Sequence, residues 1–177
     1  RRQRQMWIRA RAIRDAGIVG LGGAAFPAHV KYTVNENTKI AIVLINGAEC
    51  EPALTNDSRV MFEFPRAVVM GAMRAKKAAH AEHVIIGVEE NKPHCIEALT
   101  NAAKGTDVKI CVLKTKYPQG SEKQLVYACT GRKVPVGGLP ATVGTAVSHA
   151  SSTAALATAL VRGGPLPATD LCVTPVS

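Results

Sequence analysis

Ile40-Ala41-Ile42-Val43-Leu44-Ile45 is an unbroken apolar run, followed at once by the polar segment Asn46-Gly47-Ala48-Glu49-Cys50-Glu51-Pro52. Six consecutive apolar residues, several of them β-branched, predict a strand that is buried on both faces, as in a parallel sheet covered by helices. The segment from Phe64 to Ala79 then predicts a helix, because Pro65 suits a first helical turn. This part of the chain is therefore interpreted as one strand–helix unit.

Two more strand–helix units follow along the chain. Residues 83–88 predict a second strand, and a helix is expected from about Pro93 to just before Gly105. Residues 107–113 predict a third strand and residues 121–130 a third helix, with Ser121 at its N-cap. Crossovers of this length imply parallel strands. The predicted fold class is α/β, a Rossmann-like parallel sheet in three layers.

Polar loops follow all three predicted strands, and a parallel sheet brings such loops to one edge, where ligands bind. In the first loop, Asn46 offers an amide suited to a heterocycle edge, and Glu49 and Glu51 can accept hydrogen bonds from hydroxyl or amide groups. The second loop spans residues 89–93, and the third, residues 114–122, contains Tyr117, whose ring could stack on a ligand. Several such groups at one edge favour a nucleotide or flavin site.

Each of these groups also has an ordinary structural interpretation. The two glutamates could pair with surface lysines or arginines, and Tyr117 could simply cover the edge of the sheet. The lysines near the predicted edge could bind phosphate or remain solvated; they are Lys31, Lys114 and Lys116.

A glycine-rich segment, Gly20-Leu21-Gly22-Gly23-Ala24-Ala25-Phe26-Pro27, precedes the first strand. Glycines let main-chain N–H groups approach an anionic ligand closely, although glycine clusters also form turns that bind nothing. The dinucleotide-binding fingerprint needs a strand before its glycines, whereas residues 7–16 predict a helix. The segment is thus not a simple Rossmann phosphate turn.

Composition excludes several classes of protein. The 177 residues suffice for one domain with its own core, and no apolar run approaches the roughly 20 residues that a membrane-spanning helix needs. The net charge of +9 is concentrated partly in a basic helix within residues 1–16, but only 4% of residues are aromatic and no nucleic-acid-binding motif occurs. A solvated face or a contact with another part of a longer protein is the preferred interpretation of that helix.

The five cysteines, at positions 50, 95, 111, 129 and 172, include no C-x-x-C pair. This pattern indicates neither a disulfide framework nor a local zinc or iron–sulfur site, so reduced thiols are expected.

Several motifs, in order, resemble those of one family of redox proteins. The chain resembles the C subunit of the Rnf ion-translocating electron transport complex and, more distantly, the NADH-binding flavoprotein subunit of respiratory complex I. The resemblance rests on residues 17–27, 45–52, 90–93, 114–120, 122–125 and 130–140. It covers the chain from about Asp15 to Pro175.

The resemblance implies a domain that holds FMN noncovalently and passes a hydride between NAD(H) and the flavin. By matching position, Gly20, Gly22, Gly23 and Lys31 would surround the FMN phosphate, and Asn46 and Glu49 would meet the flavin. The positions implied for the NADH side are Phe26, Glu51 and Glu122, and those implied for the third flavin-lining loop are Tyr117 and Gly120.

The resemblance also implies a wider context. We expect 1–177 to be one FMN- and NADH-binding domain cut from a longer chain, with a C-terminal helix in 141–177 leading to missing downstream domains that carry 4Fe–4S clusters. Its expected partners are NADH and the membrane subunits of the complex, with no nucleic acid. The expected location is the cytoplasmic face of the inner membrane, held peripherally through partner subunits.

One departure from the family pattern lies near the end of the chain. Where the family usually reads Gln- or His-Asn-Val-Gly-Thr, residues 149–153 read His-Ala-Ser-Ser-Thr, so Ala150 is expected to replace an asparagine that contacts the cofactor. Two alternatives therefore stay open. One is an Rnf-like NADH-dependent cobalamin reductase, and the other is a scaffold domain that has lost its cofactor.

Overall fold

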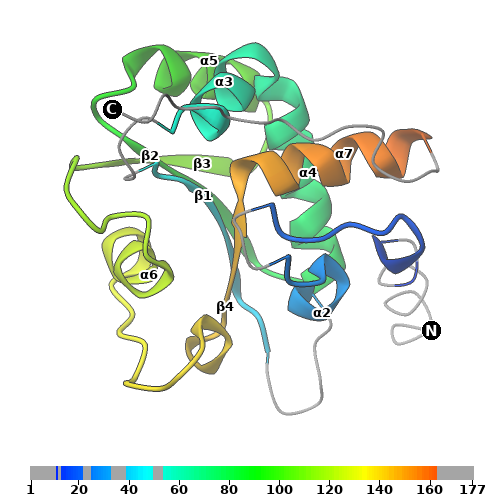
Figure 1. Cartoon of the computed structure of the whole chain (residues 1–177), viewed down its shortest axis with the longest axis vertical. Helices are drawn as coiled ribbons and strands as arrows, with labels where there is room; N and C mark the ends of the chain where they lie inside the picture. The colour runs from blue at the N-terminus through cyan, green and yellow to red at the C-terminus, as the bar shows by residue number, and fades with distance from the viewer. Residues whose placement is uncertain (1–10, 12, 22–24, 33–38, 50–53, 163–177) are drawn as a thin grey trace, which may run out of the picture.

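In the residues that the computed structural model describes, which are 11, 13–21, 25–32, 39–49 and 54–162, four parallel strands form one sheet (Figure 1). The strand order is β3-β2-β1-β4. The strands are β1 (Ile42–Gly47), β2 (His83–Glu89), β3 (Val108–Leu113) and β4 (Thr145–His149). The predicted α/β class with a parallel sheet is confirmed.

Strand β1 lies in the middle of the sheet and explains the apolar run in the sequence. It pairs with β2 on one side and with β4 on the other, and every one of its residues is buried. A strand with neighbours on both edges and helices on both faces has no position that meets water, so polar alternation is absent.

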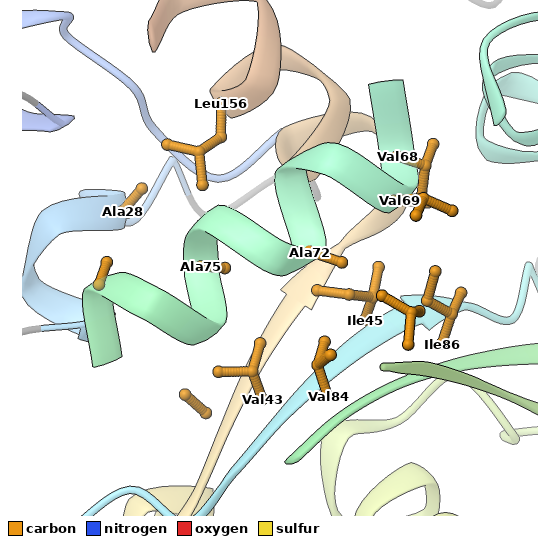
Figure 2. Close-up of a cluster of buried hydrophobic side chains, with 14 of the residues drawn as sticks. Ala28, Val43, Ile45, Val68, Val69, Ala72, Ala75, Val84, Ile86 and Leu156 are labelled. Atoms are coloured by element: carbon orange, nitrogen blue, oxygen red, sulfur yellow. The ribbon is translucent and has the colours of Figure 1, made fainter. Parts of the chain in front are cut away.

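The larger core lies between the sheet and helices α4 (Pro65–Ala79), α5 (Pro93–Ala103) and α7 (Ala150–Arg162). In Figure 2, the side chains of Val43, Ile45, Val84 and Ile86 lie between the strands and α4. Each fully buried side chain of this size contributes about 1.5–3 kcal/mol relative to exposure. Helix α3 (Asn56–Glu63) packs beside α5 and α7 on the same face.

Helix α6 (Glu122–Thr130) lies on the opposite side of the sheet (Figure 1). A smaller core lies beneath it and the short 3-10 helix η1 (Pro140–Val143). Leu125 and Val126 of α6 pack there against Leu44, Leu113 and Val147 of the sheet. Helix α2 (Ala28–Tyr32) lies against β4 and α4. The sheet is therefore covered on both faces, as the sequence predicted.

Helices α4 and α7 approach so closely that a glycine is needed between them. A Cβ atom built on Gly71 of α4 would lie 1.9 Å from the backbone oxygen of Thr153 in α7. No flexible side chain can give way there, because the clashing atom belongs to the main chain. The contact fixes how α7, and with it the end of β4, is placed against the rest of the domain.

Most predicted elements are confirmed, and three were not predicted, apart from the short 3-10 helix η1. Helices α4 and α5 begin at Pro65 and Pro93, and the third predicted helix is α6, with Ser121 at its N-cap position but without a side-chain capping bond. Strand β4 and helices α2 and α3 were missed. Of the basic helix expected within residues 1–16, residue 11 and residues 13–15 are helical, and residues 1–10 and 12 lie outside the described residues.

Candidate functional site

Asn46 ties the loop after β1 to the loop before α6. Its side chain is only 2% exposed, and it is the last residue but one of β1, although the sequence had placed it in the loop after the strand. The side-chain Nδ2 donates to the backbone oxygen of Gly120 at 2.9 Å, and Oδ1 accepts from the N–H of Ala48 at 3.1 Å. Two of the predicted site residues, Asn46 and Gly120, are thus in direct contact.

Lys31 of α2 brings a positive charge to the same edge of the sheet. Its Nζ donates to the backbone oxygen of Val147 at 3.1 Å and lies 3.6 Å from a carboxylate oxygen of Glu122. The same ammonium lies 5.8 Å from the centre of the Phe26 ring. A lysine from one segment therefore joins three parts of the chain that are distant in sequence.

The segment that contains the glycines folds back on itself beside α7. Gly20 N–H donates to the oxygen of Phe26 at 2.8 Å, and Val19 pairs with Pro27 in an isolated antiparallel bridge. The N–H of Leu21 donates to Ser152 Oγ in the first turns of α7, at 2.8 Å. Gly22 and Gly23, whose predicted role is at a phosphate, lie outside the described residues.

Glu49 is held by groups from three different elements. One carboxylate oxygen accepts from the N–H of Asp57 in α3 at 2.9 Å, and the other pairs with the ammonium of Lys92, next to α5. Its backbone N–H donates to the carboxylate of Glu89 at the end of β2, at 3.1 Å. The side chains of Glu49 and Lys92 are 5% and 12% exposed, so this ion pair is largely shielded from water.

A pocket of about 470 Å³ opens beside this ion pair. Glu49 and the exposed Tyr117, both predicted site residues, lie in its wall. The other lining residues come from the end of β2 and the loop after it, from the segments at the starts of α3 and α5, and from the third loop: Leu54, Thr55, Ser58, Glu89, Asn91, Lys92, His94, Thr115 and Lys116. Glu51, predicted for the same edge, lies outside the described residues.

His149 stands at the end of β4, directly paired in register with Asn46. Its Nδ1 lies 3.4 Å from a carboxylate oxygen of Asp57, and the other Asp57 oxygen accepts from the N–H of Ser151 at 2.9 Å and from the Ser151 hydroxyl. Burial acts to raise the pKa of Asp57, but the hydrogen bonds from His149 and Ser151 outweigh it and hold that pKa below its ordinary value. Asp57 thereby anchors the start of α7.

Ala150 is the first residue of α7 and directly follows β4. It is fully buried and belongs to the larger core cluster. The residue before it, His149, carries the polar side chain at the end of β4. The replacement of a cofactor-contacting asparagine by Ala150 stays a prediction.

Acid should destabilise the domain partly through Asp57. A lowered folded-state pKa means that the contribution of Asp57 is complete above its unfolded pKa, about 3.9, and is lost as pH falls through the folded value. We expect the free energy of unfolding to fall less steeply below pH 4 in Asp57→Asn than in the parent chain. Urea unfolding measured from pH 7 downward checks this, with exposed Asp15→Asn as the control. Equal slopes in Asp57→Asn and the parent chain would contradict the Asp57 assignment.

Comparison with known proteins shows to which family the chain belongs. The profile of the Nuo51 FMN-binding domain matches residues 13–158. The chain belongs to the Nuo51 FMN-binding domain family. That match contains every described residue of the site above.

Curated relatives carry the name expected from the motifs. The chain is 49% identical over 154 residues to the C subunit of the proton-translocating ferredoxin:NAD(+) oxidoreductase complex of Clostridium ljungdahlii, covering 87% of this chain and 34% of the relative. It is 49% identical over 156 residues to the C subunit of the Na(+)-translocating complex of Acetobacterium woodii, covering 87% and 35%. The resemblance to the Rnf-type C subunit is confirmed, and the chain spans about a third of the length of these relatives.

Solved structures support the fold. A chain of an NAD+-reducing [NiFe]-hydrogenase in the H2-reduced state superposes with a TM-score of 0.74 at 22% identity, covering 86% of this chain and 30% of that chain. The air-oxidised form gives a TM-score of 0.71 at 23% identity, covering 88% and 30%. At this identity the likeness concerns the fold of the Nuo51 FMN-binding domain. In the described parts of the chain, no helix is long and apolar enough to span a bilayer.

The chemistry of the site fits FMN. Among the described residues, two buried side-chain acceptors at the edge have no donor, Glu89 Oε1 and Gln119 Oε1. A buried polar atom without a partner costs about 1–3 kcal/mol, which a ligand that carries donors can recover. FMN carries such donors in its ribityl hydroxyls and its ring imide, and its phosphate suits the ammonium of Lys31. The donor and acceptor set is therefore complementary to this cofactor.

The sequence analysis assigned no role to several residues that shape the candidate site. Glu89 ends β2 and Lys92 stands in the loop after it. Both belong to the segment 89–93 that was predicted to reach the edge, so their position was indicated although no role was given to them. Gln119 lies in the third predicted loop. Asp57 and His149 belong to elements that were not predicted, and their spacing of 92 positions gives no local signal.

Proposed function

We propose that this domain holds FMN noncovalently and moves a hydride between NAD(H) and the flavin. The observation that carries the proposal is the position of Lys31, whose ammonium meets both the backbone of β4 and Glu122 at the start of α6. Membership of the Nuo51 FMN-binding family supports FMN as the cofactor. The NAD(H) partner is inferred from the site and from the resemblance to the Rnf-type C subunit.

Different residues would contact different parts of the cofactor. Lys31 and the segment that begins at Gly20 would face the phosphate, where a cation and main-chain N–H groups are favourable. Asn46 near the end of β1 and Glu49 in the loop after it would meet the flavin. The unpartnered acceptors Glu89 Oε1 and Gln119 Oε1 would receive the cofactor's donors.

The dinucleotide would enter from the side of Phe26, Glu122 and Tyr117. Tyr117 is 78% exposed and Phe26 is 44% exposed, which leaves both rings free to cover a second flat ligand. A flavin can accept two electrons as a hydride and release them singly, which suits it to a junction between NADH and one-electron carriers. Hydride transfer needs no acid or base from the protein, so the work of these side chains is to position two rings.

The domain would act as the electron-entry module of a membrane-bound, ion-translocating electron transport complex. Its relatives are named as subunits of such complexes, and this chain matches about a third of their length. Electrons would continue to 4Fe–4S clusters in further parts of the longer protein. Other subunits would hold the domain peripherally at the cytoplasmic face of the membrane.

FMN binding and reduction test the proposal. The chain is mixed with FMN, desalted, and titrated anaerobically with NADH while flavin absorbance is followed. We expect flavin to be retained and then bleached. Lys31→Met should weaken FMN binding by about 10- to 100-fold, because a hydrogen bond to a charged group is worth about 1.5–3 kcal/mol.

Lys39→Met is the matched control. Lys39 also pairs with a carboxylate, that of Glu82, but it lies on the surface with its side chain 76% exposed, before the start of β1. It should leave FMN affinity unchanged. Loss of all flavin from the parent chain on desalting, with no response to NADH, would contradict the proposal and favour the scaffold alternative.

A further inference from the structure

Two cysteines meet on the face of the sheet that α6 covers. Cys111 lies in β3 and Cys129 in α6, and both are free thiols that are partly buried. Both pack against the same small core cluster, which contains Leu113 and Leu125. The two side chains therefore point toward each other from the sheet and from the helix above it.

The contacts of Gly87 in β2 show where the two cysteine side chains lie. A Cβ atom built on Gly87 would lie 3.2 Å from Cys129 Sγ, so the sulfur sits directly over this glycine. Gly87 is paired in register with Cys111 on the neighbouring strand. Neighbouring strands are about 4.8 Å apart, and paired residues project to the same face. The Cys111 side chain therefore lies one strand away from the Cys129 sulfur, close enough for a disulfide to form.

The two thiols also influence each other electrostatically. Burial, followed by the charge and hydrogen bonding of Cys111, raises the pKa of the Cys129 thiol. A thiol that is held protonated attacks peroxide slowly, so the proposal gives Cys129 the resolving role. This is the arrangement of an attacking cysteine and a resolving cysteine.

We propose that Cys111 and Cys129 form a reversible disulfide between β3 and α6 when the protein meets a peroxide. The Cys111 thiolate attacks one peroxide oxygen, the O–O bond breaks, and sulfenic acid and hydroxide form. Cys129 sulfur then attacks the sulfenic sulfur, loses its proton, and displaces water as the S–S bond forms. Two thiols are oxidised, one hydrogen peroxide is reduced to two waters, and a small-molecule thiol reverses the reaction.

The disulfide would close a loop that contains the third part of the candidate cofactor site. Residues 112–128 lie between the two cysteines, and they include Tyr117, Gly120 and Glu122. Cross-linking restricts this loop in the unfolded chain and ties α6 to the sheet. The pair is thus a modification site that fixes one wall of the proposed flavin site, although its chemistry does not depend on flavin.

Peptide mapping after oxidation tests the proposal. The chain is treated with hydrogen peroxide, unreacted thiols are blocked with N-ethylmaleimide, and the protein is digested without reductant. We expect a cross-linked pair of peptides that contains Cys111 and Cys129, lighter by two hydrogens, which dithiothreitol separates. Recovery of both cysteines as singly blocked thiols, or as separate sulfonic acids, would overturn the proposal.

Cys95→Ala and Cys129→Ala separate this pair from the other thiols. Cys95 is fully buried and donates to the oxygen of Ser58, so Cys95→Ala should still form the cross-link, whereas Cys129→Ala should not. Oxidation should raise Tm by about 5–10 °C in the parent chain, as expected for a disulfide that closes a loop of this size. The same rise in oxidised Cys129→Ala would contradict the assignment of the pair.

Discussion

Gly71→Ala is expected to lower the free energy of unfolding by about 3 kcal/mol or more, the upper end of what overpacking a core usually costs. In an exposed helix the same change would stabilise the protein by about 0.5–1 kcal/mol, because alanine favours the helix. Here the added methyl would meet the Thr153 backbone oxygen at 1.9 Å, so α4 and α7 must separate. Steric exclusion outweighs helix propensity at this position.

Chemical denaturation of Gly71→Ala and Met70→Ala measures this difference. Met70 is the preceding residue of α4 and is 48% exposed, so its truncation should change the stability by no more than about 0.5 kcal/mol. Because α7 follows β4, a shift of α7 should also disturb the contact between Leu21 N–H and Ser152. A Gly71→Ala variant as stable as the parent would show that the two helices are not packed as described.

The fold could be predicted where the sequence signal is local or where all residues of an element are buried. Every position of β1 is buried, as the unbroken apolar run had predicted. Pro65 and Pro93 mark helix starts through a local constraint, the fixed φ of proline, and both helices begin there. These signals act within a few residues and need no knowledge of the tertiary structure.

Strand β4 was missed because its environment is set by tertiary contacts. Thr145 and Ser148 are buried in it, and Ser148 bonds the hydroxyl of Tyr32 in α2 at 2.7 Å. A buried serine whose partner lies 116 positions away cannot be distinguished in sequence from a surface serine. The glycine-rich segment and Lys31 could be related to the sheet only once β4 was present beside β1.

The candidate site was predicted as a set of loops, and the contacts among those loops required the structure. Asn46 and Gly120 were both expected at the edge, but the hydrogen bond that joins them depends on how α6 is seated. The network of Asp57, His149 and Ser151 gave no sequence signal, since Asp57 comes from a helix that was not predicted. Parallel-sheet topology predicts which segments meet, whereas packing decides which atoms touch.

Lys92→Met should destabilise the domain by about 3 kcal/mol, because removing one partner of a buried ion pair leaves the other charge uncompensated. The carboxylate left behind is that of Glu49, which is 5% exposed. The N–H of Asp57 would remain as a hydrogen-bond donor to it, but among the described residues no second ammonium or guanidinium pairs with this carboxylate. Urea unfolding without added cofactor measures the loss independently of flavin binding.

A double-mutant cycle isolates the pair. Glu49→Gln combined with Lys92→Met removes both charges of the ion pair and leaves no unpaired carboxylate at position 49, so the double variant should be more stable than Lys92→Met alone. Lys116→Met, an exposed lysine in the wall of the same pocket, is the control and should change the stability by no more than about 0.5 kcal/mol. Equal losses in Lys92→Met and Lys116→Met would mean that Glu49 keeps its place without Lys92. The expected result instead makes the loop after β1 dependent on a lysine beside α5, so the position of a candidate flavin-contacting carboxylate is set by the packing of the whole sheet edge.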